Sequence, residues 1–240
     1  MIPPVPTAKA ETLVQTADSW WTRFPYRPGR PLSTLTDAED SIDLLARFHR
    51  ALAGPHSGPL ARQRPGVGER LALGQWYLGA APQLPLSAVC AHLAQRSPDL
   101  PGAAAITAFL PTFLRGLELL RQAREDPAVV GLPRQPTHGD WNPSNLARAE
   151  SGDLVLYDLD ECALDLPLLD VAHALRGLRW YSKLGSEEPL AGPLMAGWLR
   201  RYHEQNPIPS VLAPHLPACF AAGPLFYLAH NFAGQIRLPE

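Results

Sequence analysis

The chain has 240 residues, of which 46 % are hydrophobic and 18 % are charged, and its formal net charge is −2. These values indicate a globular protein with a sizeable core and exclude a disordered chain. The balanced charge gives no reason to expect a nucleic-acid partner, and no stretch of the sequence approaches the length of a membrane span. Three scattered cysteines and an opening that lacks the features of a signal peptide favour a cytoplasmic protein with reduced thiols.

The first thirty residues predict short strands and then a break. Two β-prone runs, at 11–15 and 19–24, flank a turn-prone segment, and prolines and glycine interrupt any regular element between 25 and 31. Thr36 and Glu39 have the spacing of a capping box, which predicts the start of a helix. One face of that helix carries apolar residues and a histidine: Ile42, Leu45, Ala46, His49 and Leu52.

The remainder of the chain is predicted to be mostly helical. A connection rich in Pro, Gly and Arg runs from Gly54 to Gly68. Helical segments are then expected at 69–80, 84–96, 102–125, 187–205 and 217–234. A loop at 137–145, a strand at 153–158 and a second loop interrupt them, and we expect the chemistry of the protein there.

This interruption carries a set of oxygen-bearing side chains. Asp140 is followed five residues later by Asn145, and Asp158 stands at the end of the apolar run 154–157. Mg²⁺ prefers carboxylate and amide oxygens, and phosphoryl transfer needs both a metal and a carboxylate aimed at the attacking hydroxyl. The catalytic loop of protein kinases has the same spacing of Asp and Asn, followed by a metal-binding Asp.

The pattern resembles the family of aminoglycoside phosphotransferases, choline kinases and type II homoserine kinases. The matching segments are His138-Gly139-Asp140 with Pro143-Ser144-Asn145, Asp158-Leu159-Asp160, and Pro167 to Ala172 with Asp170 within it. The resemblance implies an α+β, protein-kinase-like fold, with a mostly α-helical large lobe and a remnant of the β-rich N-terminal lobe. It implies that Asp140 is the catalytic base and that Asn145 and Asp158 bind Mg²⁺. His138 and Asp170 would support the loops, and Asp160 could bind the metal or support a residue that does.

An alternative interpretation is that Asp140 and Asn145 are only turn and helix-cap residues, as Asp and Asn often are. Four elements in the family order and at suitable spacing disfavour it. His49 and His173 are expected on helices beside apolar neighbours, where a structural role is the simpler interpretation. The histidines show no metal-ligand spacing with one another or with a cysteine, so no zinc site is expected.

By the same resemblance, residues 1–30 correspond to a remnant of the nucleotide-binding lobe and the hinge, and 31–240 to the helical lobe with the catalytic loop and metal motif. Backbone groups near Phe24 and Tyr26 would face the adenine. Family members place a phosphate loop, a lysine and a glutamate before the hinge, but only about twenty residues precede it here, and the two lysines are Lys9 and Lys183. Either the natural chain is short or Met1 is an internal start.

The expected function is transfer of the ATP γ-phosphoryl group to a hydroxyl of a small molecule, with ATP and Mg²⁺ as cofactors. The alternative is a non-catalytic, pseudokinase-like binding or regulatory protein that lacks a complete ATP lobe, and a phosphatase that uses the same carboxylates is a third hypothesis. No nucleic acid or membrane partner is expected. Self-association is possible, because a missing lobe would leave apolar surface on the helical lobe. The sequence does not identify the acceptor.

Overall fold

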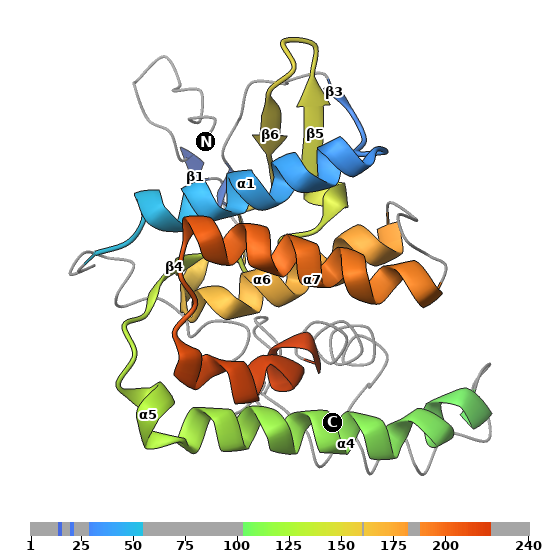
Figure 1. Cartoon of the computed structure of the whole chain (residues 1–240), viewed down its shortest axis with the longest axis vertical. Helices are drawn as coiled ribbons and strands as arrows, with labels where there is room; N and C mark the ends of the chain where they lie inside the picture. The colour runs from blue at the N-terminus through green and yellow to red at the C-terminus, as the bar shows by residue number, and fades with distance from the viewer. Residues whose placement is uncertain are drawn as a thin grey trace.

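The computed structural model describes residues 14–15, 20–21, 29–54, 103–159, 161–181 and 188–221. It is rich in helices, with three small antiparallel sheets (Figure 1). The α-helices are α1 (Leu35–Ala51), α4 (Ala103–Glu125), α5 (Pro127–Val130), α6 (Pro167–Tyr181) and α7 (Glu188–Gln205). The 3₁₀ helices are η3 (Pro143–Asn145) and η4 (Ser210–His215), and residues 216–221 continue as helix. The strands are β1 (Val14–Gln15), β2 (Trp20–Trp21), β3 (Gly29–Arg30), β4 (Gln135–Thr137), β5 (Leu146–Ala149), β6 (Leu154–Leu156) and β7 (Ala163–Asp165).

Most of the predicted elements that fall on described residues are present. The helices expected at 102–125 and 187–205 are α4 and α7, the strand expected at 153–158 is β6, and the two β-prone runs contain β1 and β2. The bounds of α6 were not predicted, and neither were β3, β4, β5 and β7, which have two to four residues each. The predicted helices at 69–80 and 84–96 lie outside the described residues.

Helix α1 begins two residues earlier than its predicted capping box. Thr34, not Thr36, is the N-cap: its side chain accepts from the N–H of Asp37, and the Asp37 carboxylate accepts from the N–H of Thr34. Both boxes have the same spacing, but only Thr34 has the extended backbone that an N-cap requires, with φ −124° and ψ 161°. The predicted face is buried, with Ile42, Leu45 and Ala46 in the core.

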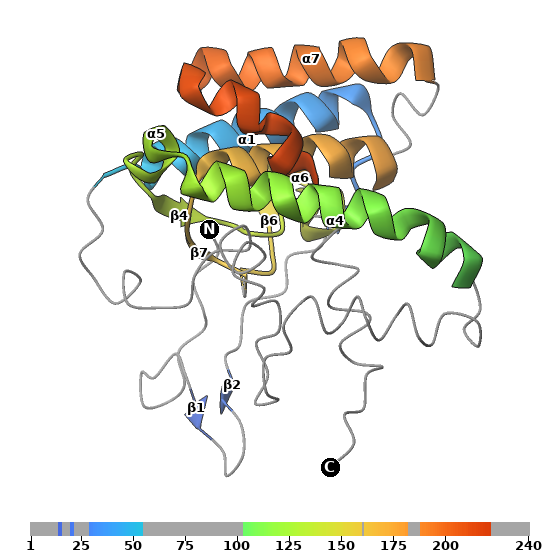
Figure 2. The same cartoon turned by 90° about the horizontal axis from the view of Figure 1, so that it is seen from below.

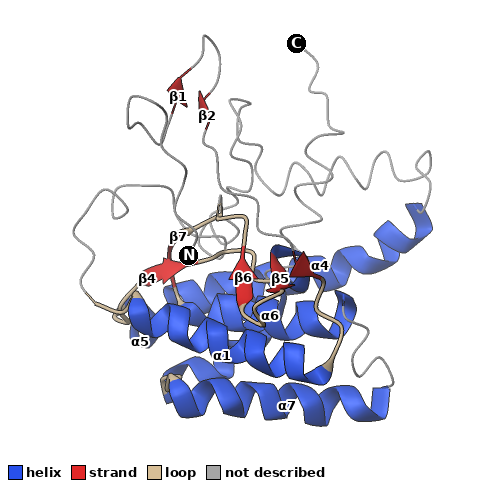
Figure 3. Cartoon of the chain, turned by 90° about the horizontal axis from the view of Figure 1, so that it is seen from above, coloured by secondary structure: helices blue, strands red, loops and turns tan. Residues whose placement is uncertain are grey.

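The core lies where α1, α6 and α7 pack against one another. Helix α6 is buried along most of its described length, including all of residues 171–175. A helix that is apolar on nearly every side belongs inside a domain, and α6 lies between α1 and α7 on one side and strands β4, β6 and β7 on the other (Figure 2, Figure 3). None of the helices among the described residues is long and apolar enough to cross a membrane.

The sheets connect the end of the predicted hinge to the predicted catalytic segment. Strand β3 pairs antiparallel with β5, with Gly29 opposite Ala149, and β5 pairs antiparallel with β6, with Leu146 opposite Leu156. Strand β4 pairs with β7, so that the strand leading into the 137–145 loop lies beside the segment that follows Asp158. Residues 29–30 therefore belong to the same sheet as the strand that leads to Asp158.

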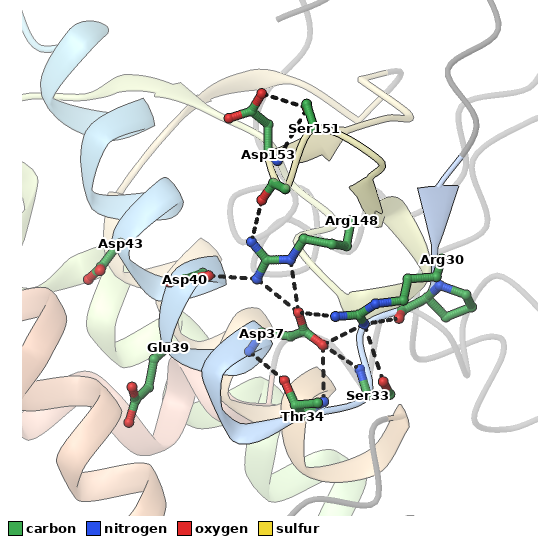
Figure 4. Close-up of polar contacts among 12 residues, drawn as sticks. Arg30, Ser33, Thr34, Asp37, Glu39, Asp40, Asp43, Arg148, Ser151 and Asp153 are labelled. Carbon is green, nitrogen blue, oxygen red and sulfur yellow. Dashed lines mark hydrogen bonds and ion pairs between the residues drawn. The ribbon is translucent and has the colours of Figure 1, made fainter.

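A buried carboxylate fastens this sheet to α1 (Figure 4). Asp37 is 1 % exposed and accepts hydrogen bonds from Arg30 on β3 and from Arg148 on β5, at 2.8 to 3.1 Å. Arg148 also donates to Asp40 at 2.6 Å. Burial by itself raises the pKa of Asp37, but the hydrogen bonds from Arg30, the N–H of Ser33 and Arg148 outweigh it and hold that pKa well below its ordinary value.

This lowered pKa predicts acid sensitivity. Because the folded-state pKa lies below the unfolded value, the stabilisation is present above about pH 4 and is lost progressively as the pH falls towards the folded-state pKa. Asp37→Asn should lower the free energy of unfolding by about 2 kcal/mol at pH 7 and by clearly less at about pH 2, nearer the folded-state pKa, in urea titrations. Asp40→Asn, at the exposed edge of the same cluster, should cost less than about 0.5 kcal/mol. An equal cost of Asp37→Asn at both pH values would contradict this assignment.

Candidate active site

The loop between β4 and β5 holds most of the predicted site residues. It passes from His138 through Asp140 to η3, where the Asn142 side chain accepts from the N–H of Ser144 at 3.0 Å and so caps the short helix. Gly139 has φ +83°, a conformation that L-residues rarely adopt, and a Cβ there would overlap the carbonyl oxygen of Glu161. The family motif therefore has a physical reason for glycine between His138 and Asp140.

Asp170 holds the start of this loop from α6. Its side chain is fully buried and accepts from the N–H of His138 at 2.6 Å, from the N–H of Gly139 at 2.8 Å and from His49 Nε2 at 3.1 Å. Burial raises the pKa of Asp170, but the hydrogen bonds from His49 and from the N–H of His138 outweigh it, so the net shift is downward. The carboxylate is therefore ionised and acts only as an acceptor.

His138 connects the loop to the strand that precedes Asp158. Its Nε2 donates to the carbonyl oxygen of Tyr157 at 2.9 Å, and its Nδ1 accepts from the N–H of Asp140 at 3.3 Å. These two bonds are compatible with one neutral tautomer, which carries its proton on Nε2. The ring is inaccessible and packs edge-on against Trp141 at 5.6 Å between centroids. Through these contacts His138 connects the start of the loop to Tyr157, the residue before Asp158.

Asn145 contacts Asp140 directly. The Asn145 Nδ2 donates to the carbonyl oxygen of Asp140 and to its Oδ2, both at 2.9 Å. Both partners are acceptors, so the nitrogen of the amide must face them and the side-chain oxygen must face away. That oxygen is a hard ligand of the kind Mg²⁺ prefers, whereas the nitrogen fixes the carboxylate.

Asp158 follows strand β6 in an unusual conformation. It is an exposed residue with φ 58°, and no other described residue besides glycine has positive φ. Its neighbour Tyr157 donates its N–H to the carbonyl oxygen of Asn145 at 2.9 Å and accepts from His138 through its own carbonyl. Left-handed backbone is tolerated by Asp at some cost and concentrates at functional sites. Both ends of the loop are thus bound to the residue before Asp158.

The predicted site residues therefore divide into three groups. His138, Asp170, Asp140 and Asn145 form one hydrogen-bonded unit, and Asp158 is joined to it through Tyr157. Asp160, Phe24 and Tyr26 lie outside the described residues. Among the residues described, no three His, Cys, Asp or Glu side chains form a group that could hold a metal. The predicted ligands Asn145 and Asp158 include one amide and one carboxylate, a donor set that suits a cation which keeps several waters and binds a triphosphate.

His173, for which the sequence indicates a structural role, lies close to the predicted site. It lies on α6, one turn beyond Asp170, and is 2 % exposed, yet neither ring nitrogen has a hydrogen-bond partner among the described residues. Burial and then the charge of Arg176 lower the pKa of His173, and the nearby carboxylates of Asp170 and Asp140 only partly oppose them. The ring lies near Asp140, where a water or a polar ligand group could satisfy its nitrogens. The sequence shows only a histidine on a buried helix, which usually has a structural role.

Helix α6 approaches the loop closely at Gly177. A Cβ there would lie 2.8 Å from Pro143 Cδ and 3.1 Å from Asn142 Cβ. Gly177→Ala should therefore displace η3, reduce any activity that depends on the loop and lower the free energy of unfolding by about 1–2 kcal/mol. Gly197→Ala on α7 is the matched control, since a Cβ there meets no described atom within 4 Å. It should stabilise the protein by about 0.5–1 kcal/mol through helix propensity. Equal melting temperatures for the two variants would contradict the close approach.

Comparisons with known proteins agree with this fold. An aminoglycoside phosphotransferase from Alicyclobacillus acidocaldarius superimposes with a TM-score of 0.63 at 17 % identity, over 99 % of this chain and 69 % of its own. Amicoumacin kinase hAmiN, solved with AMP-PNP and Ca²⁺, gives 0.64 at 15 % identity, over 99 % and 66 %. A microcompartment-associated aminopropanol kinase gives 0.50 at 16 % identity, over 96 % and 73 %. These similarities define a kinase-like fold.

The sequence comparison then gives the family. The model of the phosphotransferase enzyme family matches residues 2–220. The chain belongs to this family. A search of the curated proteins found no match. The segment with the buried Asp170 and the Asp140–Asn145 pair lies inside the matched range.

Proposed function

We propose that the protein is an ATP-dependent phosphotransferase that transfers the γ-phosphoryl group to a hydroxyl of a small molecule. The observation that supports this most strongly is the contact between Asp140 Oδ2 and Asn145 Nδ2, in a loop whose N–H groups are held by buried Asp170. Phosphoryl transfer depends mainly on positioning and charge stabilisation. A carboxylate that is held in place before the substrate binds contributes to the positioning.

In this proposal Asp140 is the general base. It accepts the proton of the acceptor hydroxyl while that oxygen forms a bond to the γ-phosphorus and the bond between the γ-phosphorus and the bridging oxygen of ADP breaks. Asn145 keeps Asp140 Oδ2 in place, and the His138 ring keeps the N–H of Asp140 oriented. The backbone of the loop then has little freedom to move the base away from the acceptor.

Asn145, through its Oδ1, and Asp158 are the residues proposed to hold Mg²⁺. When bound, the cation would offset the negative charge of the triphosphate. Asp158 presents an exposed carboxylate from a fixed left-handed turn, and the Asn145 oxygen faces away from Asp140. Asp160 is proposed as a neighbouring carboxylate that binds the metal or supports Asp158.

The division into a nucleotide-lobe remnant with hinge at 1–30 and a helical lobe at 31–240 also remains a proposal. It is supported by the pairing of β3 with β5, which places residues 29–30 in the sheet that leads to Asp158. Backbone groups near Phe24 and Tyr26 are proposed to face the adenine of ATP. The chain spans 69 % and 66 % of the lengths of the first two structural neighbours.

The acceptor is proposed to be a small molecule that carries both hydroxyl and amino groups. The names of the structural neighbours include aminoglycoside, aminopropanol and spectinomycin enzymes. The test is ³¹P NMR of ATP and Mg²⁺ with the protein and, in turn, an aminoglycoside, spectinomycin and aminopropanol. A phosphate monoester signal together with ADP is expected for at least one acceptor and should be absent with Asp140→Asn. Magnesium-dependent ATP binding with no transfer to any acceptor would favour the non-catalytic alternative.

A further inference from the structure

A chain of hydrogen-bonded side chains, buried except for the half-buried Asn206, extends from the proposed catalytic loop to the far end of α7. Asn206, one residue beyond α7, donates from Nδ2 to Tyr202 Oη at 2.6 Å, and Tyr202 Oη lies 2.7 Å from His49 Nδ1. His49 Nε2 lies 3.1 Å from Asp170 Oδ2, the oxygen that also accepts from the N–H of His138. His49, Asp170 and Tyr202 are at most 1 % exposed. We refer to Asn206, Tyr202, His49 and Asp170 as the relay.

With a neutral His49, one arrangement of protons satisfies every contact of the relay. Asp170 is an ionised acceptor, so His49 donates to it from Nε2 and its Nδ1 carries no hydrogen. An amide nitrogen only donates, so Tyr202 Oη accepts from Asn206 and uses its own hydrogen for His49 Nδ1. Tyr202 therefore selects the tautomer of His49, and Asn206 selects the direction of the Tyr202 hydroxyl. Without the hydroxyl, the other tautomer would turn a lone pair of His49 towards the Asp170 carboxylate.

We propose that Tyr202 and Asn206 are positioning residues for the catalytic loop, which act through His49 and Asp170. Among the described residues, their side-chain hydrogen bonds run to each other and to His49, not to the loop, so their effect is to keep the oxygen that binds the N–H of His138 in place. This inference rests on the proposed function in one respect only, namely that the loop is the catalytic one. The order of the loop itself can be measured without ATP or an acceptor.

Helices α1 and α7 are also joined at a second place, which provides a matched control. The Asp43 carboxylate on α1 accepts hydrogen bonds from Nε and Nη2 of Arg201 on α7, both at 2.7 Å. It also accepts one from Gln205. This contact links the same two helices as the His49–Tyr202 bond but does not include Asp170. Asp43→Asn therefore weakens the packing of α7 on α1 and leaves the relay unchanged.

The test compares Tyr202→Phe, Asn206→Ala and Asp43→Asn by NMR. In Tyr202→Phe, the amides of His138 and Gly139 should exchange with solvent about fivefold to tenfold faster relative to amides of α4, the effect of one lost buried hydrogen bond. The ¹⁵N shifts of His49 should move towards a mixture of tautomers. Asn206→Ala should change both measurements in the same direction but less, and it keeps the test decisive if Tyr202→Phe fails to fold. Asp43→Asn should change neither.

Turnover separates this inference from the proposed function. If the wild-type chain transfers phosphate, Tyr202→Phe should lower kcat by about tenfold and leave the KM for ATP within about twofold, because the loop and not the nucleotide contacts would be disturbed. If the wild-type chain shows no transfer, the proposed function fails, while the exchange and tautomer measurements still decide the role of Tyr202. Unchanged exchange at His138 and Gly139 in Tyr202→Phe and Asn206→Ala, or equal changes in Asp43→Asn, would overturn the inference.

Discussion

Replacing Asp140 with asparagine is expected to lower kcat for phosphoryl transfer by about a thousandfold, the usual scale for losing a positioned general base. The amide keeps the size of the carboxylate, and its oxygen can still accept from Asn145 Nδ2, so the loop should keep its shape. The KM for ATP should change little. Steady-state kinetics with the best acceptor measure both quantities.

Asp153→Asn is the control for Asp140→Asn. Asp153 is an exposed carboxylate at the tip of the β5–β6 hairpin, where it accepts from Ser151 Oγ at 2.8 Å. The Asp153→Asn substitution removes one negative charge, as Asp140→Asn does, but from the hairpin and not from the loop. It should leave kcat within about twofold. A loss of less than tenfold in Asp140→Asn would assign the base to another residue.

The second large effect is expected for Asp170→Asn, which should lower the free energy of unfolding by about 3–5 kcal/mol. Three donors converge on two carboxylate oxygens: the N–H of Gly139 on Oδ1, and the N–H of His138 with His49 Nε2 on Oδ2. An amide has one oxygen, so its NH₂ group must face at least one of these donors in either orientation. Urea unfolding followed by circular dichroism gives the difference.

Asp126→Asn provides the comparison on the surface. Asp126 caps α5 by accepting from the N–H of Ala128 at 2.9 Å, and asparagine is an equally good N-cap. Its loss of stability should be clearly smaller than that of Asp170→Asn. If Asp170→Asn costs no more than Asp126→Asn, the buried carboxylate does not organise the loop, and the role given to the relay is wrong as well.

Several helices were predictable because their sequence signals are local. The apolar face of α1 and the long amphipathic α4 repeat at helical spacing, and the apolar strand before Asp158 ends at a loop. The capping box was misplaced because Thr34 with Asp37 and Thr36 with Glu39 have the same spacing, and only the backbone conformation at Thr34 distinguishes them. Strands β4 and β7 have three residues each and depend on one another, so neither run is recognisable alone.

The motif of the proposed site is recognisable in the sequence, but its connections are not. The resemblance gave Asp140, Asn145 and Asp158 their expected roles and made His138 and Asp170 loop supports, and the hydrogen bonds of His138 and Asp170 agree with that support. No sequence pattern joins His49 to Tyr202, because 153 positions separate them and each looks like an ordinary helical residue. The same holds for the ion pairs of Arg148 with Asp37, which are 111 positions apart. Such contacts are set by the packing of α1, α6, α7 and the sheet.

The central claim, that Asp140, Asn145 and Asp158 form the magnesium–nucleotide site, is tested most directly by ¹H–¹⁵N NMR of the labelled protein titrated with ATP. With Mg²⁺ present, the amides of residues 139–146 and 157–159 are predicted to shift, and the measurement is sensitive even to weak binding. With EDTA in place of Mg²⁺, or in Asp158→Ala, those shifts should disappear. Equal shifts with and without Mg²⁺, shifts confined to other parts of the chain, or unchanged binding by Asp158→Ala would contradict the claim.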